Sequence, residues 1–331
     1  MSHSNRLLAS AIALLVATVP TAAAARPRLV KHVDYVTKVS LSGDPDPTAA
    51  STGYASVRGG SVWELARFGY PGDAGGTGIT DARRFDQDEG LSADGSWEMT
   101  YSQCTTSSDC RLYAYRLDAQ RGYVATPIAA SLAGRNTFPA TWLGELAYVH
   151  EGLAGPEVSL QDLLTAQTRV VMSAPRPTAA VAGLDLVASQ LAVAWRWTDA
   201  KRRTLSRVDV VDTQTGRRRI VLRAGPGTPR KGQLISPSIH DGQMYFALSS
   251  PRGRFYRLTL STFALASRSA PSHLTSVVVG GRNFPDTRDV VLYETAATGS
   301  GSRATCETAT GSRSGCGLWT WSFAGRFPGF R

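Results

Sequence analysis

The sequence predicts an all-β protein built from one four-stranded sheet that is repeated along the chain. Strand-like segments recur with a period of about 45 residues, and no helical periodicity extends beyond a turn or two after residue 25. Within these segments apolar and β-branched residues alternate, and Gly and Asp turns bound them. About six such sheets form a β-propeller, which protects its sheet edges by closing into a ring. We therefore expect residues 26–331 to form a single six-bladed β-propeller domain, with five or seven blades as alternatives.

The first 25 residues have the pattern of a cleavable signal peptide. A polar segment ends in Arg6, an apolar run covers residues 7–19, Pro20 breaks the run, and alanines occupy 22–25. The run is shorter than the about 20 residues that cross a bilayer, and the alternative is a buried N-terminal helix. No later stretch approaches membrane-spanning length. We therefore expect residues 1–25 to be removed and the mature chain to be secreted, extracellular and without a membrane span.

The repeat is clearest over residues 180–225, where four strands are expected at 181–187, 190–197, 207–211 and 218–222. Before it, we expect units at 53–68 with a strand at 61–68, at 91–128 with strands at 96–101, 111–117 and 123–128, and at 136–173 with strands at 144–150, 158–163 and 168–172. After it, we expect a unit at 233–268 with strands at 235–239, 243–248, 254–260 and 264–268. The last unit is expected at 273–323, with strands at 274–279, 290–294 and 318–323. The last unit lacks a fourth strand, whereas the strand at 32–41 belongs to no unit. We expect this N-terminal strand to complete the last blade and to close the ring.

Two short motifs recur at the strand ends. Ser92, Asp94 and Gly95 open an apolar strand, a looser copy of this pattern occupies 236–246, and Asp212 and Gly216 connect two strands. These segments resemble the repeats of TolB-type secreted β-propellers. The resemblance covers about half of the chain, and it departs from the pattern in the units near 140 and 285, which lack the Asp-Gly pair. It implies the propeller fold and a binding or scaffolding role, and the hydrolase domain that accompanies some of these propellers has no counterpart here.

Four cysteines form two closely spaced pairs, Cys104/Cys110 and Cys306/Cys316. An even number of cysteines in an exported chain is typical of disulfides. Three pairings are possible, and the local pairing is favoured because each pair brackets a polar turn. Loops this short would each stabilise the fold by about 2–3 kcal/mol. The alternative is a four-thiolate zinc site, but neither pair has the spacing that zinc sites normally use.

The composition is strongly basic, with a formal net charge of +10. Only four of the basic residues are lysines, and the basic positions are scattered along the chain without interleaved aromatic residues. This distribution argues against nucleic acid as the natural partner. We expect a monomer that binds a protein or an anionic cell-wall polymer or polysaccharide.

Propeller topology sorts the charged loops by face. The loops between second and third strands lie on the same face as the connections between blades, because successive strands are antiparallel. Lys201, Arg202 and Arg203 occupy such a loop, and Arg230 and Lys231 occupy such a connection. We predict that these five residues form a binding site, together on the face that carries both cysteine loops. The alternative is a set of solvated charges without a ligand.

Catalytic, metal and cofactor sites have no convincing motif in the sequence. The histidines are isolated, and His150 reads as a polar residue at a strand end rather than as a catalytic base. The alternative function is an extracellular hydrolase or lyase with its site in the propeller funnel. Its acid and base groups would come from Glu145, Asp185 and Asp289. We predict no catalytic residue, no metal and no cofactor.

The tryptophans lie mostly on predicted strands, where packing between blades is their expected role. Trp195 and Trp197 form one close pair, and Trp319 and Trp321 form another. We expect strand alternation to turn one member of each pair away from the other. That member would be an inter-blade or surface aromatic residue for sugar stacking.

Overall fold

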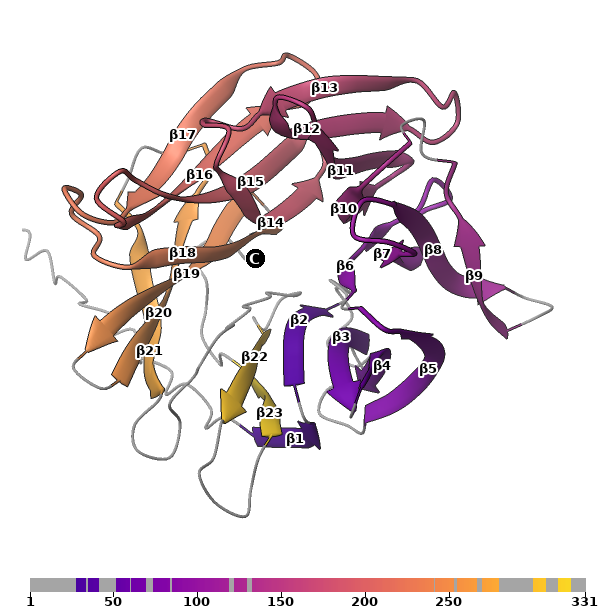
Figure 1. Cartoon of the computed structure of the whole chain (residues 1–331), viewed down its shortest axis with the longest axis horizontal. Helices are drawn as coiled ribbons and strands as arrows, with labels where there is room; N and C mark the ends of the chain where they lie inside the picture. Colours follow the sequence, from indigo (N-terminus) through magenta and orange to yellow (C-terminus); the bar gives the residue numbers. More distant parts are fainter. Residues whose placement is uncertain are drawn as a thin grey trace, which may run out of the picture.

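The structure is a computed structural model that describes residues 28–33, 35–41, 52–279, 300–307 and 315–322, apart from gaps at 60, 70–73, 84, 119–121, 130–132, 241, 253–254 and 267–269. Every regular element in these ranges is a β-strand, which confirms the all-β class. Among the residues described, no helix is long and apolar enough to cross a membrane. The sheets follow one another around a common centre in chain order, which is the β-propeller arrangement (Figure 1).

Consecutive strands pair antiparallel in units of four, each counted here as one sheet, and a parallel pair between Leu91 and Trp142 joins the second and third units into one eight-stranded sheet. The first sheet contains β2 (Tyr35–Leu41), β3 (Thr52–Gly59), β4 (Val62–Gly69) and β5 (Ala74–Asp81). The second contains β6 (Asp86–Leu91), β7 (Trp97–Cys104), β8 (Cys110–Asp118) and β9 (Gly122–Pro127). The third contains β10 (Asn136–Trp142), β11 (Glu145–Gly152), β12 (Gly155–Asp162) and β13 (Thr168–Ser173). The fourth contains β14 (Ala180–Val187), β15 (Gln190–Thr198), β16 (Thr204–Asp212) and β17 (Arg218–Ala224). The fifth contains β18 (Gln233–His240), β19 (Gln243–Arg252), β20 (Phe255–Ala264) and β21 (Ser272–Val279).

An N-terminal strand joins the C-terminal sheet. β1 (Arg28–Val33) pairs antiparallel with β23 (Gly315–Ser322), and β23 pairs with β22 (Ser300–Glu307). The prediction that 32–41 is the closing strand is wrong in its bounds, because residues 35–41 form β2 of the first sheet. Alternation runs through both strands, so the sequence does not mark where the chain changes sheets. The number of blades in the whole chain stays a prediction, since 280–299 lies outside the described residues.

The fourth sheet matches the four strands expected over 180–225. In the fifth sheet the expected fourth strand at 264–268 is wrong. Ala264 ends the third strand, and the fourth strand is β21, which was expected to open the next unit. The β-branched run in β21 pairs along β20, the preceding strand, and this pairing decides its membership. The strand expected at 290–294 lies outside the described residues.

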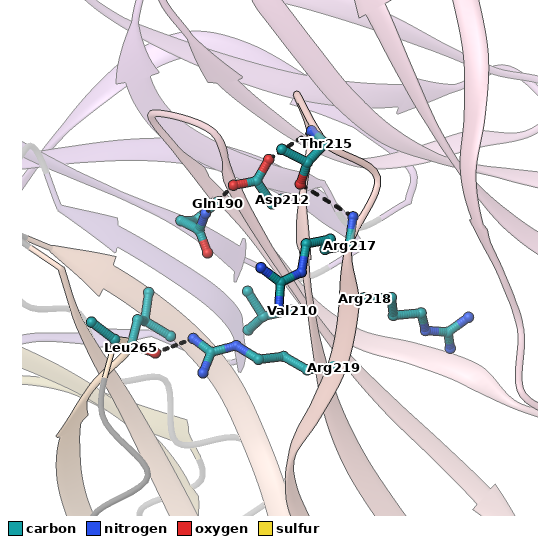
Figure 2. A pocket seen from close by; sticks show the side chains of 9 residues that line it. Gln190, Val210, Asp212, Thr215, Arg217, Arg218, Arg219 and Leu265 are labelled. Atoms are coloured by element: carbon teal, nitrogen blue, oxygen red, sulfur yellow. Dashed lines mark hydrogen bonds between the residues drawn. The ribbon is translucent and has the colours of Figure 1, made fainter.

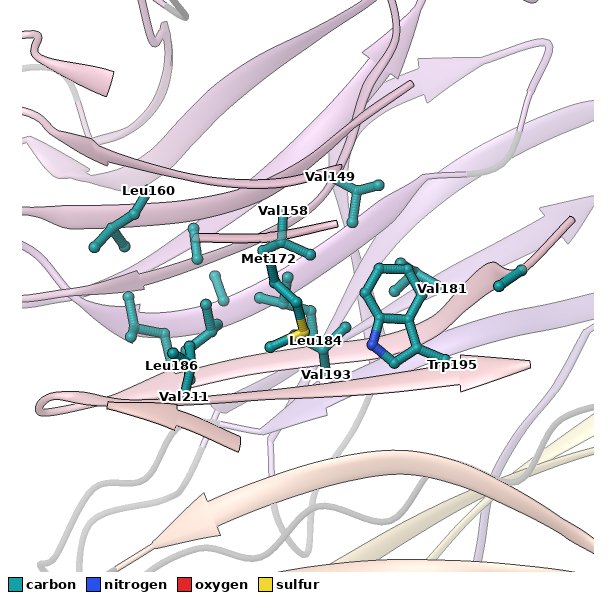
Figure 3. Close-up of a cluster of buried hydrophobic side chains, with 14 residues drawn as sticks. Val149, Val158, Leu160, Met172, Val181, Leu184, Leu186, Val193, Trp195 and Val211 are labelled. Atoms are coloured by element: carbon teal, nitrogen blue, oxygen red, sulfur yellow. The ribbon is translucent and has the colours of Figure 1, made fainter. Parts of the chain in front are cut away.

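The core lies between neighbouring sheets, and β15 is buried on both of its faces. Leu191, Val193 and Trp195 pack against side chains of β11, β12 and β13 in the third sheet (Figure 3). Ala192 and Ala194 point the other way, where aromatic side chains of β19 and β20 fill the space that the alanines leave. A strand between two sheets has a continuous apolar run rather than alternation. Each large buried side chain contributes about 1.5–3 kcal/mol.

The second and third sheets approach each other at backbone distance. The backbone N–H of Leu143 donates to the carbonyl of Leu91 (2.7 Å), and Leu91 also pairs with Trp142 across the two sheets. A Cβ placed on Gly90 would lie 1.8 Å from the carbonyl oxygen of Thr141. Glycine at position 90 is therefore a requirement of this close approach.

The Asp-Gly motif in the second sheet forms a hydrogen-bonded turn. Asp94 Oδ1 accepts from the hydroxyl of Ser92 (2.5 Å) and from the N–H (2.9 Å) and hydroxyl (2.6 Å) of Ser96. These bonds, with the bond from Ser92 the strongest cause, hold the pKa of Asp94 well below its usual value. Gly95 has a φ of 82°, in the left-handed region that favours glycine. The residues that carry the TolB-type resemblance thus build a turn.

Candidate functional site

Asp199 organises the loop between β15 and β16. Its Oδ1 accepts from the N–H groups of Lys201 and Arg203 (both 2.9 Å), and its Oδ2 lies 2.7 Å from Nη2 of Arg203. The bonds from Arg203, its guanidinium first, lower the pKa of Asp199, so this carboxylate stays ionised and offsets the charge of Arg203. Lys201 and Arg202 are exposed, and neither has an ion pair within the described residues.

The connection between β17 and β18 folds against this loop. The carbonyl of Arg230 accepts from the N–H of Gly225 (2.8 Å) and from the hydroxyl of Thr228 (2.8 Å). Gly225 has a φ of 123°, and a Cβ there would lie 2.9 Å from the carbonyl oxygen of Thr204, which directly follows the loop. Glycine therefore lets the two segments touch. Lys231 is exposed and Arg230 is half-buried.

The structure thus brings together the two segments that the sequence assigned to one face. We call Lys201, Arg202, Arg203, Arg230 and Lys231 the basic edge of the fourth sheet. Of these five cations, only Arg203 has an ion pair among the residues described. The basic edge therefore presents uncompensated positive charge to solvent.

A pocket of about 340 Å³ adjoins the basic edge, and we call it the Trp197 pocket. It is lined by Thr178, Ala180, Arg196, Trp197, Thr198, Thr204 and Gln233. Thr198 and Thr204 are register partners that flank the 199–203 loop, and Gln233 directly follows the 225–232 connection. Arg196 was missed by sequence reasoning, although its place at the end of a strand that leads into a basic loop was a usable signal.

The expectation that strand alternation turns one tryptophan of each pair away is wrong for Trp195 and Trp197. Residues two apart on a strand point to the same side, and both Trp195 and Trp197 pack toward the cluster shared with the third sheet. Their positions along β15 separate them: Trp195 is buried, whereas Trp197, near the strand end, is half-buried and lines the pocket. The side chains of Trp319 and Trp321 lie outside the described part.

A second pocket, of about 420 Å³, lies at the opposite end of the fourth sheet (Figure 2). Arg217 and Arg219 reach into it from the edge of the sheet, and Arg218 points away (Figure 2). Arg218 lies 2.8 Å from the buried carboxylate of Asp209, and Arg219 donates to the carbonyl of Leu265 in the fifth sheet.

The contact of Arg219 at this second pocket has a counterpart between the third and fourth sheets. Arg169 of the third sheet donates to the carbonyl of Thr213 in the fourth, as Arg219 donates to Leu265 in the fifth. In both cases an arginine of an outer strand reaches the residue that follows the third strand of the next sheet. Two of the three arginines at 217–219 are thus engaged in holding the fold, which leaves the Trp197 pocket as the better candidate site.

The structure describes two of the three residues proposed for a hydrolase or lyase, Glu145 and Asp185. Asp185 accepts a hydrogen bond from the N–H of Ile239, Glu145 begins β11, and Asp289 lies outside the described residues. His150 Nδ1 lies 3.1 Å from Asn136 Oδ1 on the neighbouring strand. Among the residues described, no three His, Cys, Asp or Glu side chains gather to hold a metal ion.

The first cysteine pair forms the predicted disulfide. The sulfur atoms of Cys104 and Cys110 lie 2.06 Å apart across the loop between β7 and β8. Thr105 and Asp109 close the loop through an N–H to carbonyl bond of 3.0 Å. Cys306 and Cys316 are register partners on β22 and β23. Their side chains lie outside the described part, so the second disulfide stays a prediction.

Comparison with known proteins gives no family. No protein-family model and no curated protein sequence matches the chain. A nidogen/laminin complex structure is 11% identical, covers 74% of this chain and 80% of that chain, and has a TM-score of 0.47. An oligogalacturonate lyase in complex with manganese is 13% identical, with coverages of 82% and 74% and a TM-score of 0.43. The β-propeller domain of the Trilobed protease from Pyrococcus furiosus is 10% identical, with coverages of 68% and 64% and a TM-score of 0.39, so the chain spans less than two thirds of it.

Likenesses this distant, with TM-scores under 0.5, carry no argument, and the β-propeller class rests on the arrangement of the chain's own sheets. The narrower TolB-type resemblance stays a prediction. Function has to be argued from the residues of this chain.

Proposed function

We propose that the chain is a secreted, non-enzymatic binding protein that attaches to an anionic polymer of the cell envelope through the basic edge and the Trp197 pocket. The observation that supports this proposal is the contact between two separate connections, 199–203 and 225–232, which groups exposed cations beside a pocket. Positive charges grouped on one edge raise the local concentration of a polyanion and speed its association.

A polymer suits this edge better than a compact partner. Each exposed ion pair contributes only about 0–1 kcal/mol, which is too little for a ligand that contacts one or two cations. A chain with repeated acidic groups engages Lys201, Arg202 and Lys231 together, and each further contact is intramolecular once the first has formed. The core of a protein–protein interface, in contrast, is depleted of charged residues.

The compartment is consistent with such a partner. The disulfide between Cys104 and Cys110 belongs to an oxidising environment, and the pattern of residues 1–25 is that of an export signal. A cell-envelope polymer is present where such a protein is delivered.

Charge reversal tests the proposal. The triple variant Lys201→Glu, Arg202→Glu, Lys231→Glu leaves Arg203 in place, because Arg203 and Asp199 hold the loop together. We expect the mature wild type to be retained on an immobilised acidic polysaccharide at about 0.15 M salt, and the triple variant to elute without retention, since surface ion pairs at this ionic strength act over only about 8 Å.

A matched single substitution separates this edge from net charge. Arg202→Glu and Arg217→Glu change the charge equally at exposed arginines that flank opposite ends of β16 in the fourth sheet. Arg202→Glu should elute at clearly lower salt than Arg217→Glu. Equal losses in the two variants, or wild-type retention of the triple variant, would show that the basic edge is not the binding site.

A further inference from the structure

We infer that the Trp197 pocket is a subsite for one acidic sugar ring, with Trp197 as the stacking surface and Arg196 as the partner of the sugar carboxylate. This inference rests on the proposed function, and it narrows the ligand from any polyanion to an acidic polysaccharide. Three properties of the pocket support it: a half-buried indole, uncommitted polar side chains and an unpaired arginine at the wall.

The indole is fixed on one side and available on the other. Trp197 packs against the buried cluster that contains Trp195, and register pairing with Leu205 holds its backbone in the β15–β16 ladder. It is half-buried, and it lines the pocket. A rigid aromatic ring loses little conformational entropy when a ligand covers it. Trp197 can therefore receive the apolar face of a sugar ring without rearrangement.

The polar lining matches a polyhydroxylated ligand. Thr178, Thr198 and Thr204 contribute hydroxyls, and Gln233 contributes an amide. In the described part of the chain none of these four side chains has a hydrogen-bond partner. Each hydroxyl can donate one hydrogen bond and accept others, and the amide can do both. Sugar hydroxyls require this mixture of donors and acceptors, whereas a phosphate chain offers only acceptors.

Arg196 supplies charge selection at the wall of the pocket. It is exposed, and it has no ion pair with any described residue. The planar guanidinium presents two parallel N–H donors to a carboxylate, which gives both energy and orientation. Asp199, the carboxylate of the adjoining loop, is committed to Arg203, so Arg196 has no acidic competitor there.

The volume of the Trp197 pocket limits how many sugar rings of the polymer it can hold. At about 340 Å³ the pocket is at the lower end of the size of small-molecule sites. It therefore suits one ring, with the neighbouring rings of the polymer lying over the basic edge.

Three probes and three variants test the inference: a short linear oligo-uronate, a neutral oligosaccharide of equal length and an inorganic polyphosphate of equal charge, each titrated calorimetrically. We expect Trp197→Ala to weaken oligo-uronate binding about tenfold or more, which corresponds to about 1.4 kcal/mol, and to leave polyphosphate binding unchanged. Trp197→Phe, which keeps an aromatic ring and most of the packing, should restore most of the affinity. Arg196→Gln should weaken oligo-uronate binding without affecting the weak binding of the neutral sugar.

The outcomes separate this inference from the proposed function. Unchanged oligo-uronate affinity in Trp197→Ala and Arg196→Gln would overturn the inference that the Trp197 pocket is a sugar subsite. The proposed polyanion site at the basic edge would still stand in that case if the charge-reversal variants no longer bind polyphosphate. A wild type that binds neither oligo-uronate nor polyphosphate would overturn both. Thermal melting of each variant identifies loss of folding. If Trp197→Ala does not fold, Arg196→Gln, which changes an exposed side chain, carries the test.

Discussion

Replacing Gly90 by alanine tests the contact between the second and third sheets. The new Cβ would lie 1.8 Å from the carbonyl oxygen of Thr141, where Cβ contacts under 3.0 Å essentially never occur. The two backbones must therefore separate by about 1.2 Å. That movement takes the 2.7 Å bond between Leu143 N and Leu91 O beyond hydrogen-bonding distance.

The cost follows from these two effects. Overpacking of a well-packed contact costs about 1–3 kcal/mol, and a lost hydrogen bond adds about 1 kcal/mol. The free energy of unfolding should therefore fall by about 2–4 kcal/mol. For a domain of this size, with an unfolding entropy of about 0.6 kcal/mol per K, the melting temperature should fall by about 3–6 °C.

Calorimetric melting of the mature protein measures this shift, and Gly152→Ala is the matched control. Gly152 also lies on a strand, but the nearest atom to its added Cβ is the carbonyl oxygen of Gly155 at 3.5 Å, an ordinary contact. Its free energy of unfolding should change by no more than about 0.5 kcal/mol. Equal melting temperatures for Gly90→Ala and Gly152→Ala would refute the close approach of the two sheets.

Two further predictions concern buried charge and the second cysteine pair. Glu98 is 5% exposed, and desolvation, opposed by Arg116 and aided by Asp94, raises its pKa. The folded state therefore favours the neutral, protonated form of Glu98. As the pH rises above about 4.3, the pKa of this group in the unfolded chain, ionisation favours the unfolded state and lowers the free energy of unfolding. Glu98→Gln should raise the urea midpoint at pH 7 but not at about pH 4, and a pH-independent difference would contradict this. Cys306 and Cys316 should form a disulfide, so thiol titration of the unfolded, unreduced protein should find no reactive thiol, whereas two thiols would show that the pair is reduced.

Local chemistry made the fourth sheet predictable. Its strands have apolar runs between turn residues, and the Asp212 turn depends on neighbours in sequence: Oδ1 accepts from the N–H groups of Gln214 (3.1 Å) and Thr215 (2.8 Å). The same turn recurs at Asp162, which accepts from Leu164 and Thr165 (both 2.8 Å). Sequence reasoning missed the turn at Asp162 because it lacks the glycine of the Asp212 turn. Ala166, with a φ of 57°, takes the left-handed conformation there that Gly216 takes in the Asp212 turn.

The candidate site was only partly predictable for a different reason. The sequence placed Lys201 and Arg230 on one face, since strand direction alone decides this. It did not associate Arg196 with them, because the pocket forms only where the ends of β14, β15, β16 and β18 meet. Alternation along β15 also could not predict that Trp195 is buried and Trp197 only half-buried. The exposure of these two side chains depends on how far the neighbouring third sheet extends over them.

By itself, the sequence determined the all-β class, most of the strand positions, the turn residues and the first disulfide, because each shows in the alternation, turn chemistry or cysteine spacing of a short stretch of the chain. Tertiary structure alone decided that residues 28–33 pair with β23, that β21 belongs to the fifth sheet, and that Arg196 and Trp197 line a pocket beside the basic edge. The first and third of these features depend on contacts between segments far apart in the chain, and the second depends on which of two neighbouring sheets β21 joins. Such contacts are selected by the packing of whole sheets, and no local pattern encodes that packing.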